Sequence, residues 1–356
     1  MSFDSSQAFD LPLLPPSLNI ADQSLFDILL KARTELAELN GAVIALPNPM
    51  LLLSPAIVKE SLASSEIENI HTTLEEALQN QLFPESEQRN PDKEVLRYRE
   101  ALLWGYAQLP NLPISTRLIL GIHQQLLSSG GEFRKQQNQI ANTVTKEIIY
   151  TPPIAANIPA LIGNWENFVN DDTQKIDPLI RAAIAHYQFE AIHPFTDGNG
   201  RTGRILMVLS LVQDKLLHLP VLYISGFINK NRAEYYRLLR AITTDADWYS
   251  FIKFFLHAFH QQALETKKML FAVFMLYQKF LDQIKASHPK IYSADLVQQL
   301  FSYPILTPVS LGEKLDIHYT TASRHLHTLA EGGYLKSSKV GKYHFFINHQ
   351  LMTILS

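Results

Sequence analysis

The sequence of 356 residues contains no cysteine, which excludes disulfide bonds and metal sites built on thiolates. It has no excess of either charge: 31 Lys and Arg stand against 34 Asp and Glu, so the overall charge does not call for nucleic acid or a membrane surface as a partner. The first residues, MSFDSSQAFDLPLLPP, lack the basic start and apolar run of a signal peptide. The longest apolar run, around 205–212, is far shorter than the roughly 20 residues that span a bilayer. These absences predict a soluble cytoplasmic protein without a membrane partner.

What the sequence does contain favours a large helical core. Apolar residues make up 46% and charged residues 18%, and the length allows two or three domains. Apolar side chains recur at helical spacing over most of the first 286 residues. The expected helices cover 22–39, a stretch beginning after Pro55, 93–108, 117–127, 158–169, 178–191, a stretch ending at 216, 232–242, 247–265 and 268–286.

Two segments depart from this helical pattern. Residues 130–153, which end in EIIYTPP, lose the helical period and predict a loop or a short β-hairpin. After residue 287, short helices at 293–302, 311–315 and 320–331 precede an alternating segment centred on Val340-Gly341-Lys342, which is typical of a two-stranded wing. The predicted fold class is therefore mainly α, with a small α+β module at the C-terminal end.

The most informative stretch is HPFTDGNGRTGR at 193–204, directly before an apolar helix. Its GxGxxG pattern is weak evidence for a dinucleotide fold, because no apolar strand precedes it and no acid lies about 20 residues downstream. Glycines at a helix start still let backbone N–H groups converge on an anion, and the helix N-terminus adds positive charge. Arg201 and Arg204 share one face of the first turn, where a bound anion would offset their repulsion by the helix dipole. The stretch predicts a polyphosphate site.

Three neighbouring residues extend this prediction. Asp197 lies beside the expected phosphates, where a lone carboxylate is a natural ligand for Mg²⁺. His193 ends the preceding helix and, with an unperturbed pKa near ~6.5, could take a proton from an incoming hydroxyl. Phe195 is the one large apolar residue and is expected to anchor the loop in the core. Each residue alone has a structural alternative, since Asp-Gly and Asn-Gly form ordinary turns and a lone histidine is more often structural.

The stretch matches every defined position of the signature HPFx[D/E]GNGRxxR and so resembles Fic-domain proteins. The resemblance implies an all-helical catalytic core and a protein adenylyltransferase, which moves AMP from ATP onto a Tyr, Thr or Ser hydroxyl of a target protein. It implies His193 as general base and Asp197 as the Mg²⁺ ligand. The residues that it implies bind the nucleotide are Gly198, Asn199, Gly200, Arg201, Thr202, Gly203, Arg204, Tyr235 and, less directly, Tyr236. Paired tyrosines in an amphipathic helix can equally be plain core, and that alternative stays open.

Two further segments are similar to parts of this family. EIIYTPP resembles the flap that pairs with the target by strand addition, which implies docking by Ile148, Ile149 and Tyr150. SSEIEN at 64–69 fits the inhibitory motif [S/T]xxxE[G/N], whose defined positions here are Ser64, Glu68 and Asn69. The resemblance implies that Glu68 pairs with Arg204, so that ATP binds only in a pose unfit for in-line attack. Without the resemblance, Glu68 would be read as an ordinary surface acid.

The predicted domains are an N-terminal helical region (1–110) with an inhibitory helix at about 56–70, a Fic catalytic core (111–256), a linker helix (257–286) and a winged helix (287–356). The winged helix could place Thr321, Ser323 and Arg324 in a DNA groove, with Lys336, Lys339 and Lys342 on phosphates. Residues 287–356 carry only six basic against four acidic residues, a faint footprint for DNA, and such modules also dock proteins or form dimers.

Several functional alternatives remain at this stage. A DNA-binding transcriptional regulator could use the Fic core as a nucleotide sensor, or Glu68 could orient water so that the enzyme removes AMP instead of adding it. Transfer of phosphate or phosphocholine by the same motif is a further alternative. A homodimer is implied only by the family likeness.

Overall fold

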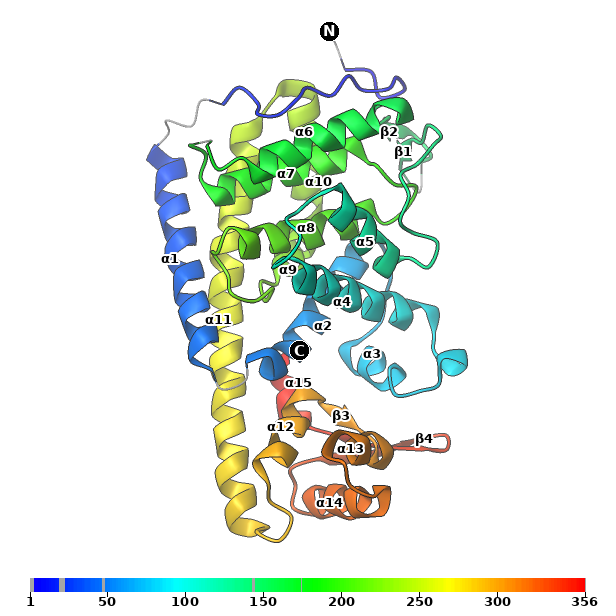
Figure 1. The fold of residues 1–356 in the computed structure, drawn as a ribbon, viewed down its shortest axis with the longest axis vertical. Helices are drawn as coiled ribbons and strands as arrows, with labels where there is room; N and C mark the ends of the chain where they lie inside the picture. Colours follow the sequence, from blue (N-terminus) through cyan, green and yellow to red (C-terminus); the bar gives the residue numbers. More distant parts are fainter. Residues whose placement is uncertain (1–2, 19–22, 47–48, 143–144, 174, 356) are drawn as a thin grey trace.

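A computed structural model of the chain describes residues 3–18, 23–46, 49–142, 145–173 and 175–355, and within them it leaves the side chains of 50–56 and 85 undescribed. The described chain is mostly helical with two small antiparallel sheets (Figure 1), which confirms the predicted fold class. In chain order the helices are α1 (Gln23–Ala45), α2 (Pro49–Ile67), α3 (Leu74–Asn80), α4 (Asn90–Gln108), α5 (Thr116–Leu126), α6 (Ile158–Asn170), α7 (Pro178–Ile192), α8 (Asn199–Gln213), α9 (Ile224–Lys230), α10 (Arg232–Asp245), α11 (Trp248–Ser287), α12 (Ala294–Ser302), α13 (Pro308–Leu315), α14 (Tyr319–Glu331) and α15 (His349–Leu355). The strands are β1 (Ile140–Ala141), β2 (Ile148–Tyr150), β3 (Ile305–Leu306), β4 (Lys336–Val340) and β5 (Tyr343–Ile347), with short 3₁₀ turns at Glu85–Glu87 and Ala155–Asn157.

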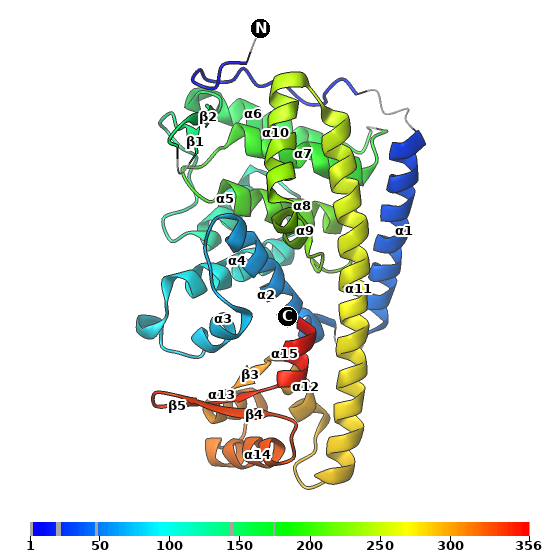
Figure 2. The same cartoon turned by 180° about the vertical axis from the view of Figure 1, so that it is seen from behind.

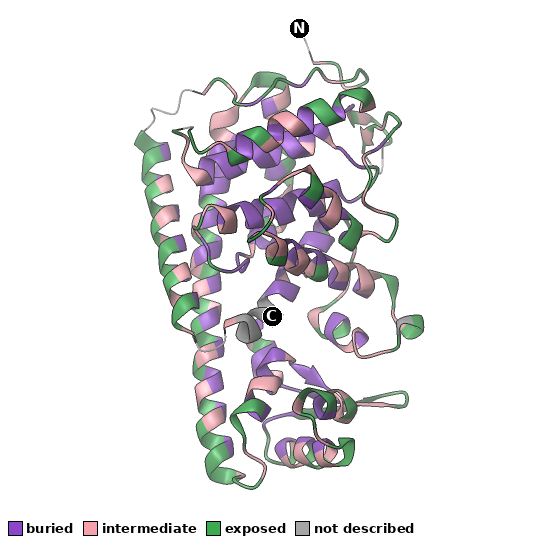
Figure 3. Ribbon diagram, in the orientation of Figure 1, coloured by how far each residue is buried: buried purple, intermediate pink, exposed green. Residues whose placement is uncertain are grey.

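Helices α7 and α8 form the centre of the larger core (Figure 3). Nearly every residue of α7 is buried, including its alanines and its polar His186 and Gln188, so this helix is enclosed on all sides. Pro178 occupies the first turn of α7, and the Asp177 carboxylate accepts a hydrogen bond from the Leu179 N–H as an N-cap. The loop from 193 to 198 joins α7 to α8, so the motif lies between two helices that are buried in the core.

Helices α1, α2 and α11 differ most from those expected, and several other helix ends are shifted by a few residues. Helix α1 continues past Gly41 and ends at Ala45. A Cβ added to Gly41 would meet no atom within 4 Å, so this glycine is not required by close packing. Helix α2 begins at Pro49, whereas the sequence predicted a helix beginning after Pro55. The two helices predicted at 247–265 and 268–286 are one, α11, because no glycine or proline separates them.

The C-terminal module contains the predicted helices and hairpin. Its sheet has the order β3-β5-β4, and β5 pairs antiparallel with both neighbours. The second half of α11 packs against α12 and α14 in a core of its own, and α11 thus runs along both cores (Figure 2). The predicted boundary between 256 and 257 falls inside α11, and the division into domains stays a prediction, as does the winged-helix assignment.

A third apolar cluster joins the C-terminal module to the N-terminal region. It combines Val58 of α2 and Val95 of α4 with Ile305 and Phe345 of the sheet. The module is therefore packed against the helix that carries the predicted inhibitory motif. None of the described helices is both long and apolar enough to cross a membrane.

Candidate functional site

The loop between α7 and α8 is fixed by its own side chains. His193 ends α7 in the left-handed region, with φ 48° and ψ 58°, and its N–H donates to the Phe189 carbonyl. Phe195 is fully buried, and its ring stacks on His123 with centroids 3.6 Å apart, so it anchors the loop as expected. Asn199 accepts from the Phe195 N–H and donates to the Phe195 carbonyl, both at 2.8 Å. The Asn199 side chain is therefore committed to the loop, and only its backbone remains for the phosphate contact that the resemblance implied.

The start of α8 has the backbone geometry of an anion site. Gly198 lies immediately before the helix at φ 76°, a conformation that favours glycine. A Cβ on Gly200 would collide with the carboxylate of Glu68 and the guanidinium of Arg204. Helix α8, Glu68 and Arg204 thus converge at one point, where a carboxylate lies over the first turn of the helix.

Glu68 and Arg204 form an ion pair with 2.8 Å between Oε1 and Nη2. The Arg204 side chain is 1% exposed and also donates to the Ser64 hydroxyl at 2.8 Å and to the Ser64 carbonyl at 3.0 Å. Burial works against both charges, yet Arg204 lowers the pKa of Glu68 and Glu68 raises the pKa of Arg204. Both groups are therefore ionised, and the structure brings together the pair that the resemblance implied. Its inhibitory effect stays a prediction.

The end of α2 explains the last position of the inhibitory motif. Asn69 has φ 62°, and its N–H donates to the Glu66 carbonyl at 3.0 Å. Glycine and asparagine adopt this left-handed conformation most readily, so either residue can end the helix just after the glutamate. The side-chain Oδ1 of Asn69 accepts a hydrogen bond from Arg232 at 3.2 Å, and the Glu66 carboxylate accepts one from Asn229 at 2.6 Å. Two contacts with α9 and α10 thereby hold the end of α2 in place.

Arg201 lies between two carboxylates. Its side chain is buried, with Nη1 2.7 Å from Glu94 Oε2 and Nη2 3.6 Å from Asp197 Oδ2. Asp197 is 74% exposed and accepts from the Gly198 N–H at 2.7 Å. No sequence motif indicated Glu94, which lies on α4 more than a hundred residues away from Arg201. In this structure Arg201 is already neutralised, while Asp197 is open to solvent.

The environment of His193 shifts its acidity. Burial lowers the pKa of His193 to about 4, and the nearby Arg134 cation acts in the same direction. The value near 6.5 expected from the sequence is thus not the value in the folded protein. A neutral imidazole is the form that can accept a proton, and a lower pKa makes that form dominant at pH 7 but weaker as a base.

The tyrosines of α10 have opposite environments. Tyr235 is 2% exposed, and its hydroxyl is 2.9 Å from His186 Nε2 within the core. Tyr236 is 45% exposed, and the Arg232 guanidinium lies 5.9 Å from the centre of its ring. Besides burial, the charge of Glu68 raises the pKa of Tyr236, which places this ring near the ion pair. The structure therefore favours Tyr236 over Tyr235 as a wall of the site, because Tyr235 has no free ring face.

Two other motif residues serve packing. A Cβ on Gly203 would collide with Glu190 and the Phe189 ring, so this glycine permits close approach of α7 and α8. Thr202 is fully buried, and its hydroxyl has no hydrogen-bond partner among the described residues. The nucleotide binding that the resemblance implies for both residues stays a prediction.

The flap is a short hairpin, as expected. Strand β2 pairs antiparallel with β1, with Ile140 opposite Tyr150. Ile148 is half-buried, whereas Ile149 is exposed and available for docking. The Tyr150 hydroxyl donates to the Ala191 carbonyl at 2.9 Å, so this side chain is directed into the fold rather than outward.

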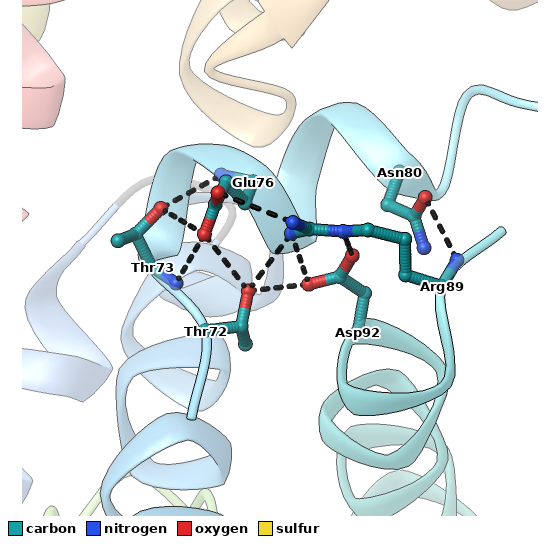
Figure 4. Close-up of polar contacts among 6 residues, drawn as sticks. All are labelled: Thr72, Thr73, Glu76, Asn80, Arg89 and Asp92. Atoms are coloured by element: carbon teal, nitrogen blue, oxygen red, sulfur yellow. Dashed lines mark hydrogen bonds and ion pairs between the residues drawn. The ribbon is translucent and has the colours of Figure 1, made fainter. Parts of the chain in front are cut away.

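A polar cluster fixes the connection that follows the inhibitory helix (Figure 4). Thr73 caps α3 in a capping box with Glu76, and Arg89 pairs with the buried Asp92 at 2.7 Å. The Thr72 hydroxyl donates to Asp92, which ties the chain after α2 to the start of α4. The residues of this cluster are Thr72, Thr73, Glu76, Asn80, Arg89 and Asp92. It holds α4, which carries Glu94, in a fixed relation to the end of α2.

Comparisons with known proteins cover most of the chain. Residues 113–211 match the Fic/DOC family model, 26–107 match the Fic/DOC family N-terminal model, and 276–351 match the C-terminal domain model of SoFic-like protein adenylyltransferases. Among curated proteins, the protein adenylyltransferase Fic of Drosophila virilis is 32% identical over 149 residues, which cover 40% of this chain and 28% of that protein. The protein of the same name from Drosophila melanogaster is 30% identical, with 40% and 27% covered. The match thus spans under a third of these relatives' length.

Solved structures share the fold. A Fic family protein from Desulfovibrio desulfuricans superposes with a TM-score of 0.59 and 20% identity, covering 94% of this chain and 98% of that one. Fic-1 from C. elegans superposes with a TM-score of 0.52 and 21% identity, covering 74% and 75%. At these identities the likeness concerns the fold alone.

Proposed function

Since this chain belongs to the Fic/DOC family, we propose that it is a protein adenylyltransferase that uses Mg-ATP, transfers AMP to a hydroxyl of a target protein, and is held inactive by Glu68. One observation carries the proposal. The start of α8 and the buried Arg204 form a positively charged cradle beside His193, and a carboxylate from a distant segment occupies it. A helix N-terminus with a guanidinium is a ready site for phosphates.

The proposed reaction uses His193 as the base. The imidazole takes the proton of the acceptor hydroxyl, and that oxygen attacks the α-phosphorus of ATP. The bond between this phosphorus and the bridging oxygen breaks, and pyrophosphate leaves with the electron pair. Arg204 and the N–H groups at the start of α8 stabilise the charge on the phosphates. The loop contacts of Phe195 and Asn199 keep the imidazole fixed beside them.

Asp197 fits the role of a magnesium ligand. Its carboxylate is largely exposed: Oδ1 accepts a hydrogen bond from the Gly198 N–H, and Oδ2 lies 3.6 Å from Arg201 Nη2. Mg²⁺ usually binds one or two carboxylates together with phosphate oxygens and water, so a lone exposed carboxylate beside a phosphate site is a suitable donor. The ion would supply positive charge to the phosphates when bound with ATP.

The proposed inhibition follows from occupancy. Glu68 holds the Arg204 guanidinium that the terminal phosphate of ATP would otherwise contact. ATP must therefore displace the carboxylate or bind in another pose. Ser64 keeps its two contacts with Arg204 in either case, so the guanidinium stays in place when Glu68 leaves.

Labelled ATP tests the proposed reaction. The full chain and its Glu68→Gly variant are incubated with Mg-ATP carrying label at the α or the γ position, and protein-bound label is counted. We expect label only from the α position, with more in the variant. Label from γ alone would show phosphate transfer instead. Release of AMP from protein already modified would show the reverse, hydrolytic reaction.

DNA contact and a homodimer stay predictions for the C-terminal module. The Lys342 ammonium, expected to touch a DNA phosphate, instead lies 3.1 Å from the Glu87 carboxylate, and the neighbouring Tyr343 ring packs on Phe83. The tip of the hairpin is thus engaged with the N-terminal region, whereas Arg324 on α14 is exposed. A salt-dependent shift of the full chain on duplex DNA, lost in Arg324→Ala, would support DNA contact, and analytical ultracentrifugation would test the dimer.

A further inference from the structure

Arg134 is a buried arginine that the motif does not include. It lies in the loop before the flap, and no carboxylate among the described residues pairs with it. Its guanidinium instead donates to three backbone carbonyls: Nε to His193 at 2.9 Å, Nη1 to Gln136 at 3.1 Å and Nη2 to Pro153 at 2.5 Å. Its own N–H donates to the Pro194 carbonyl at 2.9 Å. One side chain thus joins the histidine loop to the end of the flap.

The C-terminal end of α7 explains why hydrogen-bond donors are needed near His193. The last carbonyls of a helix have no partner within the helix, and a cation near them is favourable. The Tyr150 hydroxyl takes the Ala191 carbonyl, and Arg134 takes the His193 carbonyl. Both donors come from the flap or from the loop before it. A guanidinium can reach several carbonyls in one plane, which an ammonium on a lysine stem cannot.

We propose that Arg134 is a positioning residue that fixes the flap relative to His193, so that an acceptor hydroxyl held on the flap meets the imidazole. The inference rests on the proposed function, since the acceptor is the hydroxyl of that reaction. Orientation of this kind matters because a small displacement between base and hydroxyl lowers the rate strongly. Among the described residues Arg134 has its hydrogen bonds to backbone carbonyls and none to Arg204 or Glu68, so we expect the Kd of ATP not to depend on it.

The geometry has an electrostatic consequence. Burial lowers the pKa of His193 most and the Arg134 cation adds to this lowering, while a hydrogen bond with the Glu190 backbone and the charges of Glu68 and Asp197 act in the opposite direction. Removing the cation raises the pKa of His193. The acid limb of the rate profile then moves to higher pH.

The test compares Arg134→Gln with Lys135→Gln, both in the Glu68→Gly background. Lys135 is the neighbouring cation, is exposed, and pairs with Glu132 on the surface. For self-modification from α-labelled ATP, we expect Arg134→Gln to lower kcat at least tenfold and to move the acid limb of kcat/KM upward. The Kd of ATP should stay within threefold. Lys135→Gln should match the background, and Arg134→Lys should recover only part of the loss.

Hydrogen exchange gives a readout that needs no activity. Without nucleotide, Arg134→Gln should speed exchange of backbone amides in both 147–153 and 193–197 and leave α8 unchanged. If Arg134→Gln does not fold, Tyr150→Phe replaces it, because it removes only the hydroxyl bond to Ala191. It should lower kcat in the same direction without loss of ATP affinity.

Two kinds of failure are distinguishable. The inference is overturned if the folded Arg134→Gln variant has the same kcat as the Glu68→Gly background. It is also overturned if a loss of ATP affinity accounts for the fall in rate. If Arg134→Gln fails to fold, the inference is overturned when Tyr150→Phe has the same kcat as the Glu68→Gly background. If no variant incorporates α-label, the proposed function fails instead. Hydrogen exchange in 147–153 and 193–197 then tests by itself whether Arg134 couples the flap to the histidine loop. Unchanged exchange in both segments would overturn this coupling.

Discussion

Replacing Glu68 with glutamine tests whether ATP competes with this carboxylate. Arg204 is almost fully buried, while Glu68 is 36% exposed, so ATP can displace the acid but must bring a negative group to the same guanidinium. A hydrogen bond to a charged group contributes about 1.5–3 kcal/mol. If the terminal phosphate takes the place of Glu68, the variant should bind ATP about 10- to 150-fold more tightly, since each 1.4 kcal/mol is tenfold.

The same replacement should weaken the protein when ATP is absent. Arg204 then keeps only its Ser64 partners, so its buried charge is less well compensated. We expect the free energy of unfolding to fall by about 1.5–3 kcal/mol without nucleotide and to recover more steeply with added ATP than in the parent. Tighter ATP binding together with a lower free energy of unfolding would indicate that ATP and Glu68 compete for Arg204.

Calorimetry for Mg-ATP binding and urea unfolding without ATP measure the two quantities. The matched control is Glu66→Gln, near the end of α2 and two residues before Glu68, whose exposed carboxylate accepts a hydrogen bond from Asn229 instead of pairing with Arg204. The control should leave ATP affinity near the parent value. Reduced stability of Glu68→Gln with unchanged ATP affinity would refute the competition, and no change in either would show that the pair is not formed in solution.

Three further outcomes are expected. His193→Ala should reduce transfer from α-labelled ATP by at least ~10²-fold and leave the Kd of ATP unchanged; lost binding would mean that the ring shapes the pocket. Burial raises the pKa of Glu60 to about 7, although it accepts from the Tyr98 hydroxyl and the Ser225 N–H. Because the native state then binds more protons than the unfolded state between about pH 4.5 and 7, this group's stabilising contribution is lost as pH rises through 7; Glu60→Gln should flatten the decline in urea-unfolding free energy between pH 5 and 8. Ser293, whose hydroxyl caps α12 at 3.0 Å, should cost about 1 kcal/mol of unfolding free energy on change to alanine, measured by the same unfolding against the parent chain.

Local patterns predicted much of the fold. Helices with regular apolar spacing appear close to their expected bounds. The loop at 193–198 and its anchor Phe195 follow from residues adjacent in the chain. The pairing of Glu68 with Arg204 joins residues 136 positions apart, and only the resemblance to a known family indicated it.

Long-range partners and side-chain direction could not be read from the sequence. Glu94 and Arg134 occupy no recognisable motif, and their partners are a distant guanidinium and backbone carbonyls, which leave no pattern in residue types. Tyr235 and Tyr236 are adjacent and chemically identical, so only the packing of α10 decides which ring is buried. Asn199 has the right chemistry for a phosphate ligand, but its amide serves the loop.

Helix α11 limits how this polypeptide can be shortened. Its second half buries Val273, Phe280 and Ile284 in the core that it shares with α12 and α14. Removing the residues after 287 would expose these apolar side chains, and it would also expose Val58 on α2. Exposed apolar surfaces of that kind promote aggregation. Proteolytic cleavage near residue 287 would therefore yield a fragment that tends to aggregate. Either half is best studied by point substitution in the intact protein.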